Sequence, residues 1–245
     1  MNEDLFVVNR KNAITVTEKQ IKIILWYVVE CYLLTLKDNA KYSKTWVKNH
    51  TTYKFENYLK NQLVEDYLIK NKDLLKQKTL ILNDINFGCE TEKNYIDSQD
   101  GKKKPDKIDI YINKLGLRDV WKENDENIYF AIECKRIEKL SNVNYYISDI
   151  EKFSNRNYLN TRLPFEGQLA FIENPLITHI QLSDKVNKKL KEKTAIITNN
   201  FLSPLTIHSQ FNGIYLSAHK RNTDKQKSFT VYHLLFDYSN IVVDY

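Results

Sequence analysis

The chain has 245 residues, enough for one substantial hydrophobic core with or without an extension. Apolar residues at 42% and aromatic residues at 12% exclude a disordered chain, and only 5 glycines and 4 prolines leave little material for long linkers. The net charge of +6 suits an anionic partner such as nucleic acid, but a moderate excess of lysine is weak evidence by itself. The cysteines are far apart and the first residues contain no signal-peptide run, so we expect a cytoplasmic protein without a disulfide framework.

An apolar helix is predicted near the N-terminus. Residues 17–20 (TEKQ) have the spacing of a capping box and predict a helix that begins there and runs to about Leu36. The apolar stretch Ile23–Leu36 is interrupted by Glu30 and is too short to span a bilayer, so we expect no membrane association. Because this helix is apolar nearly all round, it needs cover from the chain itself or from a partner subunit, and internal packing is the expectation.

A second helix is predicted over Tyr53–Leu75, after the polar connection Asp38–Lys54. Its apolar stripe consists of Phe55, Leu59, Leu63 and Tyr67. Glu56 lies inside this stripe and would face the sheet, whereas Glu65 lies on the opposite, solvated face. Glu56 is equally well explained as an acid in the first turn of the helix, where the helix dipole favours a negative charge.

The segment after this helix predicts a strand and a basic loop. Thr79–Phe87 is predicted to be the first strand, and Gly88–Lys104 a polar loop. The loop ends in three consecutive lysines, Lys102, Lys103 and Lys104. These lysines are candidates for contacts with phosphate groups, although such a run more often belongs to a solvated loop.

Two apolar runs with strand spacing follow, Ile108–Ile112 and Ile128–Cys134, and both carry acids. In the first run the three isoleucines are predicted to share one face, with Asp109 on the other; in the second, Glu133 shares a face with Lys135. A carboxylate in such a strand is costly unless it is paired or holds a metal. If the two strands are neighbours, the two acids and the lysine meet on one surface that suits a hard cation such as Mg²⁺. A half-buried sheet whose charges face solvent would give the same pattern.

The rest of the sequence predicts two more helices and several strands. A helix capped by Ser141 or Asn142 is predicted, and its inner face consists of Val143, Ile147, Ile150 and Phe153. Gly167–Ile172 is predicted as a core strand, and Asn174-Pro175 begins a lysine-rich helix over Leu176–Lys193. The last predicted strands are Thr194–Thr198, Gly213–Ala218, Phe229–Phe236 and Ile241–Val243.

The residues Pro105-Asp106 (or Ile108-Asp109), followed by Glu133-Cys134-Lys135, resemble the motif of the PD-(D/E)XK nuclease superfamily, the fold of many restriction endonucleases. The predicted order from residue 53, which is helix, three strands, helix, strand, matches the αβββαβ core of that superfamily. The resemblance covers roughly residues 53–172. It implies an α/β fold with a restriction endonuclease-like αβββαβ core, a central mixed sheet flanked by helices, and an N-terminal helical extension. The expected domains are residues 1–50 for the extension and 51–245 for the nuclease-like part.

The resemblance also implies a function: a metal-dependent phosphodiesterase that cleaves nucleic acid, DNA in the first instance, in restriction or another anti-phage defence. Asp109 and Glu133, with the backbone carbonyl of Cys134, would hold Mg²⁺, for which Mn²⁺ can substitute. In this family a glutamate from a helix before the sheet often completes the metal site, a role that Glu56 fits. Lys135 would position or help deprotonate the attacking water.

Two details of the implied site are expectations of their own. Asp106 carries the literal Pro-Asp and is the second candidate for the metal-binding aspartate or a substrate contact, whereas Asp109 sits inside the strand pattern and is preferred. The side chain of Cys134 should face the core as a small apolar group.

Other functions are compatible with the same residues. The fold can carry an inactive site and act as a subunit that binds nucleic acid or a protein partner. The apolar N-terminal helix can also serve as the working surface of an interaction protein, in a homodimer or a defence complex. The sequence contains no H-E-x-x-H, no glycine-rich phosphate loop and no G-x-S-x-G, which disfavours zinc-protease, P-loop and serine-hydrolase chemistry.

Overall fold

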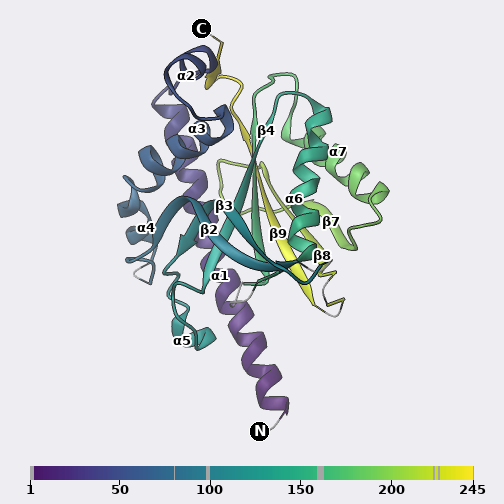
Figure 1. The fold of residues 1–245 in the computed structure, drawn as a ribbon. Helices are drawn as coiled ribbons and strands as arrows, with labels where there is room; N and C mark the ends of the chain where they lie inside the picture. Colours follow the sequence, from purple (N-terminus) through teal and green to yellow (C-terminus); the bar gives the residue numbers. More distant parts are fainter. Residues whose placement is uncertain are drawn as a thin grey trace.

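The computed structural model describes residues 3–79, 81–97, 100–158, 163–222, 224–225 and 227–244. Within these residues the chain forms an eight-stranded mixed sheet with helices on both faces, and a separate two-stranded sheet (Figure 1). Most neighbouring strands are antiparallel, but β6 is parallel to both β4 and β9. The strands in order across the large sheet are β5 (Arg156–Tyr158), β2 (Asn86–Asp97), β3 (Lys103–Asn113), β4 (Tyr129–Ile137), β6 (Phe165–Ile172), β9 (Ser228–Asp237), β8 (Ile214–Lys220) and β7 (Thr198–Pro204).

The N-terminal helix α1 is longer than predicted and spans Glu3–Lys37. Thr17 lies inside it, where its Oγ1 donates to Ala13 O at 2.7 Å, so the predicted capping box does not start the helix. The apolar part of α1 is buried in the main core with the sheet, which confirms the prediction of internal packing. Its buried residues include Ile21, Ile24, Leu25, Val28 and Tyr32. In the described part of the chain, no helix has the length and apolar content needed to cross a membrane.

Helices cover the two faces of the sheet in separate layers (Figure 1). The first layer contains α1, α3 (Phe55–Gln62), the π-helical turn η1 (Leu63–Leu68) and α4 (Lys72–Lys78), which pack into the main core. The second layer contains α6 (Val143–Asn155) and α7 (His179–Glu192), which enclose a second apolar cluster on the opposite face. The predicted inner face of α6 is confirmed, because all four of its residues are buried.

The helix predicted over Tyr53–Leu75 is interrupted. Its middle is the π-helical η1, and residues 69–71 separate η1 from α4. Asn71 lies at the break, and both its backbone N and its side-chain amide donate to Tyr67 O, at 3.1 and 2.9 Å. The predicted stripe still faces the sheet, since Leu59 and Leu63 are fully buried in the main core.

The first strand does not lie where the sequence predicts it. Thr79–Phe87 is mostly turn, with Leu80 outside the described residues, and β2 begins only at Asn86. Most of the predicted loop Gly88–Lys104 instead forms the arms of the β2–β3 hairpin. The β2 arm is half-buried or exposed along most of its length and lacks the apolar alternation from which strands are predicted.

The second half of the chain agrees better with the prediction. β6, β8 and β9 each begin and end within two residues of the predicted strands. α7 begins after Thr178, which forms a capping box with Gln181, and not at Asn174-Pro175. β7 starts at Thr198, where the predicted strand Thr194–Thr198 ends.

The remaining elements are short. β1 (Tyr42–Ser43) and β10 (Val242–Val243) form the parallel two-stranded sheet, which brings the C-terminal segment next to α2 (Lys44–His50). α5 (Arg118–Trp121) and η2 (Leu140–Asn142) lie in the connections on either side of β4. From α3 onward the main elements are a helical segment (α3, η1 and α4), then β2, β3, β4, α6 and β6, with the short α5, η2 and β5 inserted. Apart from these insertions, this is the predicted order of helix, three strands, helix, strand.

Candidate functional site

β3 and β4 pair over only part of their length. Their Cα partners end at the pair Ile110 and Ile132. Continued in the same register, Asp109 would stand opposite Glu133, but here the strands part and Cys134 N donates to Asp109 Oδ2 at 2.9 Å. We call this divergence, with Asp109 on one arm and residues 133–135 on the other, the fork.

Asp109 lies beside an irregularity in the neighbouring strand, and its side chain contacts α3. Glu90 of β2 lies opposite Asp109 and has a left-handed backbone, with φ of 54°. The side-chain alternation breaks at this point, because Ile110 packs in the main core whereas Ile108 packs with Tyr111. The prediction that the isoleucines of this run share one face is therefore wrong for Ile108.

A buried lysine of α3, Lys60, binds Asp109. Its Nζ donates to Asp109 Oδ1 at 3.0 Å and to Glu90 Oε1 at 3.2 Å, and its side chain is 1% exposed. Burial alone would raise the pKa of Asp109, but the Lys60 ammonium and the Cys134 N–H outweigh it, so the pKa lies below its ordinary value. Sequence reasoning missed Lys60, because a lysine on a helix gives no local sign that its ammonium is buried.

Glu133 is a buried acid on β4, on the face opposite the side chain of Cys134. The residue is 7% exposed, and its Oε1 has no hydrogen-bond partner among the described residues. Burial raises the pKa of Glu133 well above its ordinary value, and the negative charges of Asp109 and Asp149 raise it further. Such a carboxyl group is either neutral or needs a cation beside it.

Lys135 reaches from β4 to α6. Its Nζ lies 3.0 Å from Asp149 Oδ2 and donates to Cys134 O at 2.9 Å. Burial lowers the pKa of Lys135, but the charges of Asp149, Glu56 and Asp109 outweigh it and raise the pKa above its ordinary value. Asp149 was missed from the sequence, although its place between Ile147 and Ile150 on the inner side of α6 was a usable signal.

Glu56, and not Glu65, reaches the strands of the fork. Glu56 Oε2 accepts a hydrogen bond from Arg136 N at 3.0 Å, and its Oε1 lies 3.7 Å from Lys135 Nζ. Glu65 is exposed on η1. The sequence argument that only Glu56 would point at the sheet therefore agrees with the geometry.

The three lysines lie apart from the fork, whereas Asp106 is near enough for its negative charge to raise the pKa of Glu133. Asp106 is buried and forms an ion pair with Arg156 of β5. Lys104 pairs with Asp97 and Asp100, each at 2.9 Å. Lys102 and Lys103 are exposed at the hairpin tip, and at about 3.3 Å per residue the start of β3 lies roughly 20 Å from Asp109.

The side chain of Cys134 is fully buried in the main core, as predicted from the strand alternation. Burial raises the pKa of its thiol well above the ordinary value, so it is an inert apolar group. Its carbonyl oxygen, in contrast, lies in the fork and accepts from Lys135.

The fork contains oxygen atoms of the kind that divalent cations bind, and they differ in whether they already have a partner. Glu133 Oε1 is a buried acceptor without a partner among the described residues, which a cation would satisfy. Asp109 and Cys134 O already accept hydrogen bonds from Lys60 and Lys135, so a cation would share these oxygens with ammonium groups. Nowhere in the described ranges do three or more His, Cys, Asp or Glu side chains form a cluster able to hold a metal.

A row of buried polar side chains continues from the fork across the sheet. Glu133 stands opposite Gln168 of β6, which stands opposite His233 of β9. Gln168 Nε2 donates to Tyr146 O, and Gln168 Oε1 has no partner among the described residues. His233 lies 2.9 Å from Tyr146 Oη and 2.8 Å from Ser217 Oγ. Sequence reasoning did not predict this row, because its members and their partners come from five separate elements.

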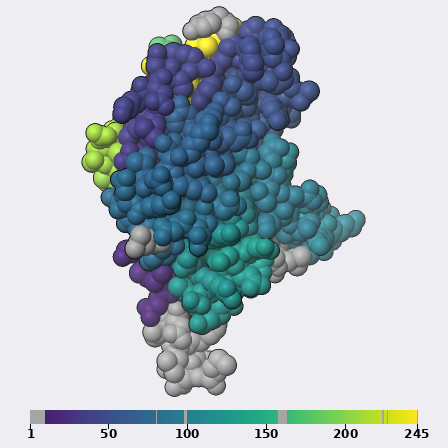
Figure 2. All heavy atoms as spheres, turned by 90° about the vertical axis from the view of Figure 1, so that its left-hand side faces the viewer, coloured from purple at the N-terminus to yellow at the C-terminus, as the bar shows by residue number. Residues whose placement is uncertain are grey.

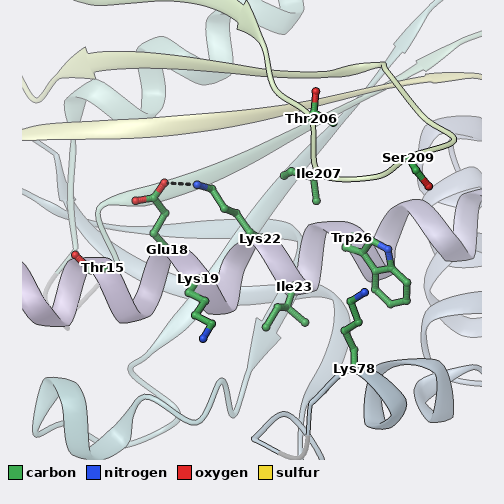
Figure 3. A pocket seen from close by; sticks show the side chains of 10 residues that line it. All are labelled: Thr15, Glu18, Lys19, Lys22, Ile23, Trp26, Lys78, Thr206, Ile207 and Ser209. Atoms are coloured by element: carbon green, nitrogen blue, oxygen red, sulfur yellow. Dashed lines mark ion pairs between the residues drawn. The ribbon is translucent and has the colours of Figure 1, made fainter.

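A cavity of about 690 Å³ lies elsewhere, against the outer side of α1 (Figure 3). Its lining includes Lys19, Lys22 and Trp26 of α1 and Lys78 of α4. The Nζ of Lys78 lies over the Trp26 ring, 4.5 Å from the ring centroid. Lys22 is paired with Glu18 at 2.8 Å. None of the residues predicted for the site lines this cavity, so it is separate from the fork.

Comparison of the chain with protein-family models, curated proteins and solved structures returns no match.

Proposed function

We propose that the chain is a metal-dependent nuclease of the PD-(D/E)XK type that cleaves nucleic acid, DNA in the first instance. Its catalytic residues are Asp109, Glu133 and Lys135, and its cofactor is Mg²⁺ or Mn²⁺. The fork carries this proposal, because it brings the carboxylates of Asp109 and Glu133 near enough for one to raise the pKa of the other, and Glu133 Oε1 has no partner among the described residues. The element order from α3 to β6 supports a restriction endonuclease-like core, whose order it shares.

The cation ligands in this proposal are Asp109, Glu133 and the carbonyl of Cys134, with Glu56 as a further candidate. A bound Mg²⁺ polarises a phosphate and makes its bound water more acidic. Asp109 suits a ligand because its lowered pKa keeps it ionised at neutral pH. Glu133 suits one because a cation would remove the electrostatic cost of ionising a buried carboxyl group.

Lys135 acts as a positive charge in this mechanism. Asp149 holds its ammonium at 3.0 Å, and its pKa lies above the ordinary value, so it stays protonated at neutral pH. It can donate hydrogen bonds to a water or to a phosphate oxygen and offset the charge that develops on phosphorus. The ion pair with Asp149 also disfavours the alternative role of Lys135 as a base, because a base must first lose its proton.

The proposal is tested by incubating the protein with plasmid, linear duplex DNA, single-stranded DNA and RNA, with Mg²⁺, with Mn²⁺ or with EDTA. We expect cleavage that needs the metal and that Glu133→Gln and Lys135→Met abolish while binding persists. Glu65→Gln is the matched control, since it removes an exposed acid from the same helical layer. The proposal would be overturned if Glu133→Gln still cleaved nucleic acid, or if the wild type cleaved none of the four substrates.

A second function, an inactive subunit that binds nucleic acid or a protein partner, is favoured by one observation. Lys60 and Lys135 already place two ammonium groups on the oxygens of the fork. If they replace the metal, Mn²⁺ should not raise the melting temperature. If the nuclease proposal holds, a millimolar concentration of Mn²⁺ should raise the melting temperature of the wild type and not that of Glu133→Gln.

The biological role proposed with this activity is restriction or another anti-phage defence, which rests on the family resemblance. It predicts that cells producing the wild-type protein resist phage infection better than cells producing Glu133→Gln. Equal plating of phage on the two strains, with equal protein levels, would refute the role and leave the nuclease activity untouched.

A further inference from the structure

Exposed aromatic side chains gather at the corner between α2 and α3. Trp46 on α2 is 48% exposed, and Tyr53, in the loop that follows, is 55% exposed. The imidazole of His50 stacks on the Trp46 indole one helical turn later, with ring centroids 5.1 Å apart and planes 15° apart. The segment lies at the surface of the face seen in Figure 2, in dark blue. We call Trp46, His50, Tyr53, Lys48 and Lys54 the aromatic corner.

The aromatic corner is held in place by its backbone. Ser43 caps α2 by accepting a hydrogen bond from Trp46 N at 3.0 Å. Thr51 closes the other end, where both its N and its Oγ1 donate to Val47 O. Val47 is buried and anchors the short helix to the body. The rings of Trp46 and His50 are therefore held by α2, whereas Tyr53 lies in the loop that follows, where its N donates to Thr51 Oγ1 at 3.2 Å.

The charge of this segment is one-sided. Residues 41–60 contain five lysines and a single acid, Glu56, but Lys44 pairs with Glu138 and Glu173, and Lys60 is buried in the fork. Lys48 and Lys54 are exposed and form no ion pair with any described residue. Exposed rings beside unpaired ammonium groups are the combination by which proteins bind single-stranded nucleic acid, with rings for the bases and cations for the phosphates.

A chain of contacts joins the aromatic corner to the fork. The Trp46 ring lies 6.2 Å from that of Tyr58, which lies 6.2 Å from that of Phe55. The Arg136 guanidinium lies over the Phe55 ring at 4.8 Å. Arg136 follows Lys135 in β4, and its N–H binds Glu56. A strand whose phosphate occupies the fork would thus pass the aromatic corner within a few nucleotides.

We propose that the aromatic corner binds unpaired bases of the nucleic acid strand that is cleaved in the fork. The ligand class, nucleic acid, is taken from the proposed function. A duplex hides the faces of its bases, so stacking on Trp46 and Tyr53 selects single strands, or duplexes with unpaired ends, over blunt duplexes. Lys48 and Lys54 contact the adjacent phosphates.

Binding measured without cleavage tests the proposal. A fluorescein-labelled 12-nucleotide DNA, the same sequence as a blunt duplex, and a duplex with an overhang are titrated with wild-type protein in EDTA, and anisotropy is recorded. We expect the single strand and the overhang to bind more tightly than the blunt duplex. Trp46→Ala should weaken single-strand binding about tenfold or more, and Tyr53→Ala should weaken it similarly. Lys48→Ala should reduce the slope of log affinity against log salt by about 0.7.

The matched control is Phe201→Ala. Phe201 on β7 is also a partly exposed ring, 36% exposed, with the Lys191 ammonium 5.5 Å from its centroid, but it belongs to the far edge of the sheet. It should leave binding unchanged. A second measurement is the quenching of intrinsic fluorescence by unlabelled single strand, which Trp46→Phe should largely remove while anisotropy still reports binding.

The outcomes separate this proposal from the nuclease proposal. Cleavage by the wild type with equal binding by Trp46→Ala refutes the aromatic corner and keeps the nuclease. Single-strand binding that depends on Trp46, without cleavage in any metal, supports the aromatic corner and refutes the nuclease. Two results overturn the proposal for the aromatic corner. One is tight binding of the blunt duplex alone, and the other is no binding of any of the three DNAs or of an RNA single strand of the same sequence. A protein partner would then remain as the occupant of the aromatic corner.

Discussion

Replacing Lys60 by methionine removes a buried ammonium group and keeps most of the side-chain volume. The ammonium lies 3.0 Å from Asp109 Oδ1 and 3.2 Å from Glu90 Oε1. At an effective dielectric constant of about 20, each attraction is worth about 5 kcal/mol before the desolvation of the lysine is subtracted. Since the variant leaves the carboxylates without their buried cation, we expect its free energy of unfolding at pH 7 to fall by about 3–5 kcal/mol.

The loss should depend on pH in a defined direction. The pKa of Asp109 is held below its ordinary value, so in the wild type this group stabilises the fold above the unfolded pKa of about 4, and the contribution disappears as the pH falls through the folded pKa. Without Lys60, Asp109 loses this contribution. The gap between wild type and variant should therefore be complete above about pH 4 and should shrink as the pH falls further, as measured by urea unfolding at pH 7 and at the lowest pH at which both proteins still fold.

The control is Lys76→Met, which breaks an exposed i, i+3 pair with Asp73 and should cost less than about 1 kcal/mol. Adding Asp109→Asn to Lys60→Met should restore part of the lost stability, because the amide oxygen can still accept from Cys134 N. A loss no larger than that of Lys76→Met, or a gap that is independent of pH, would refute the electrostatic account of Lys60.

Three further changes test other parts of the molecule by urea unfolding. Gly167→Ala places a Cβ about 2.6 Å from Ile132 Cγ1 and should cost about 1–3 kcal/mol, and unchanged stability would show that β4 can shift. Burial lowers the pKa of His219 to about 4, against about 6.5 in an unfolded chain, so this group should remove about 3 kcal/mol of stability between pH 6.5 and 4. His219→Asn should flatten that slope, and an equal slope contradicts it. Glu133→Gln should stabilise the protein by an amount that grows as the pH rises above about 4, because a raised pKa makes the ionised acid unfavourable.

The central strands could be predicted because the residues that mark them are close together in the sequence. Acids that interrupt an apolar run, such as Asp109 and Glu133, stand out in the sequence, and strand alternation places Lys135 on the same side as Glu133. The structure brings these side chains to the fork, where the charge of Asp109 raises the pKa of Glu133 and the charge of Lys135 lowers it. The contact of Asp109 with α3 could not be foreseen, because strand alternation places Asp109 on the face opposite Ile108 and Ile110, whereas in the structure Ile108 and Ile110 pack in different clusters.

The partners of the site could not be predicted, since they are distant in sequence. Lys60 is separated by 49 residues from Asp109 and by 30 residues from Glu90. Helical periodicity predicts which side of a helix faces the core, but not which buried charge a lysine will meet there. The β2 arm was missed for a related reason, because a polar hairpin takes its stability from pairing with β3 and not from an apolar face.

The buried charges of the fork also bear on whether it is a working site. A purely structural sheet gains little from such a cluster, since buried ion pairs are often no better than apolar residues of the same size. Glu133 in addition has an oxygen without a partner among the described residues, which lowers the stability of the fold. Groups that reduce stability persist where function needs them. A Glu133→Gln variant that is more stable and inactive would therefore identify the fork as a functional site, whereas one that is less stable would make Glu133 a structural residue.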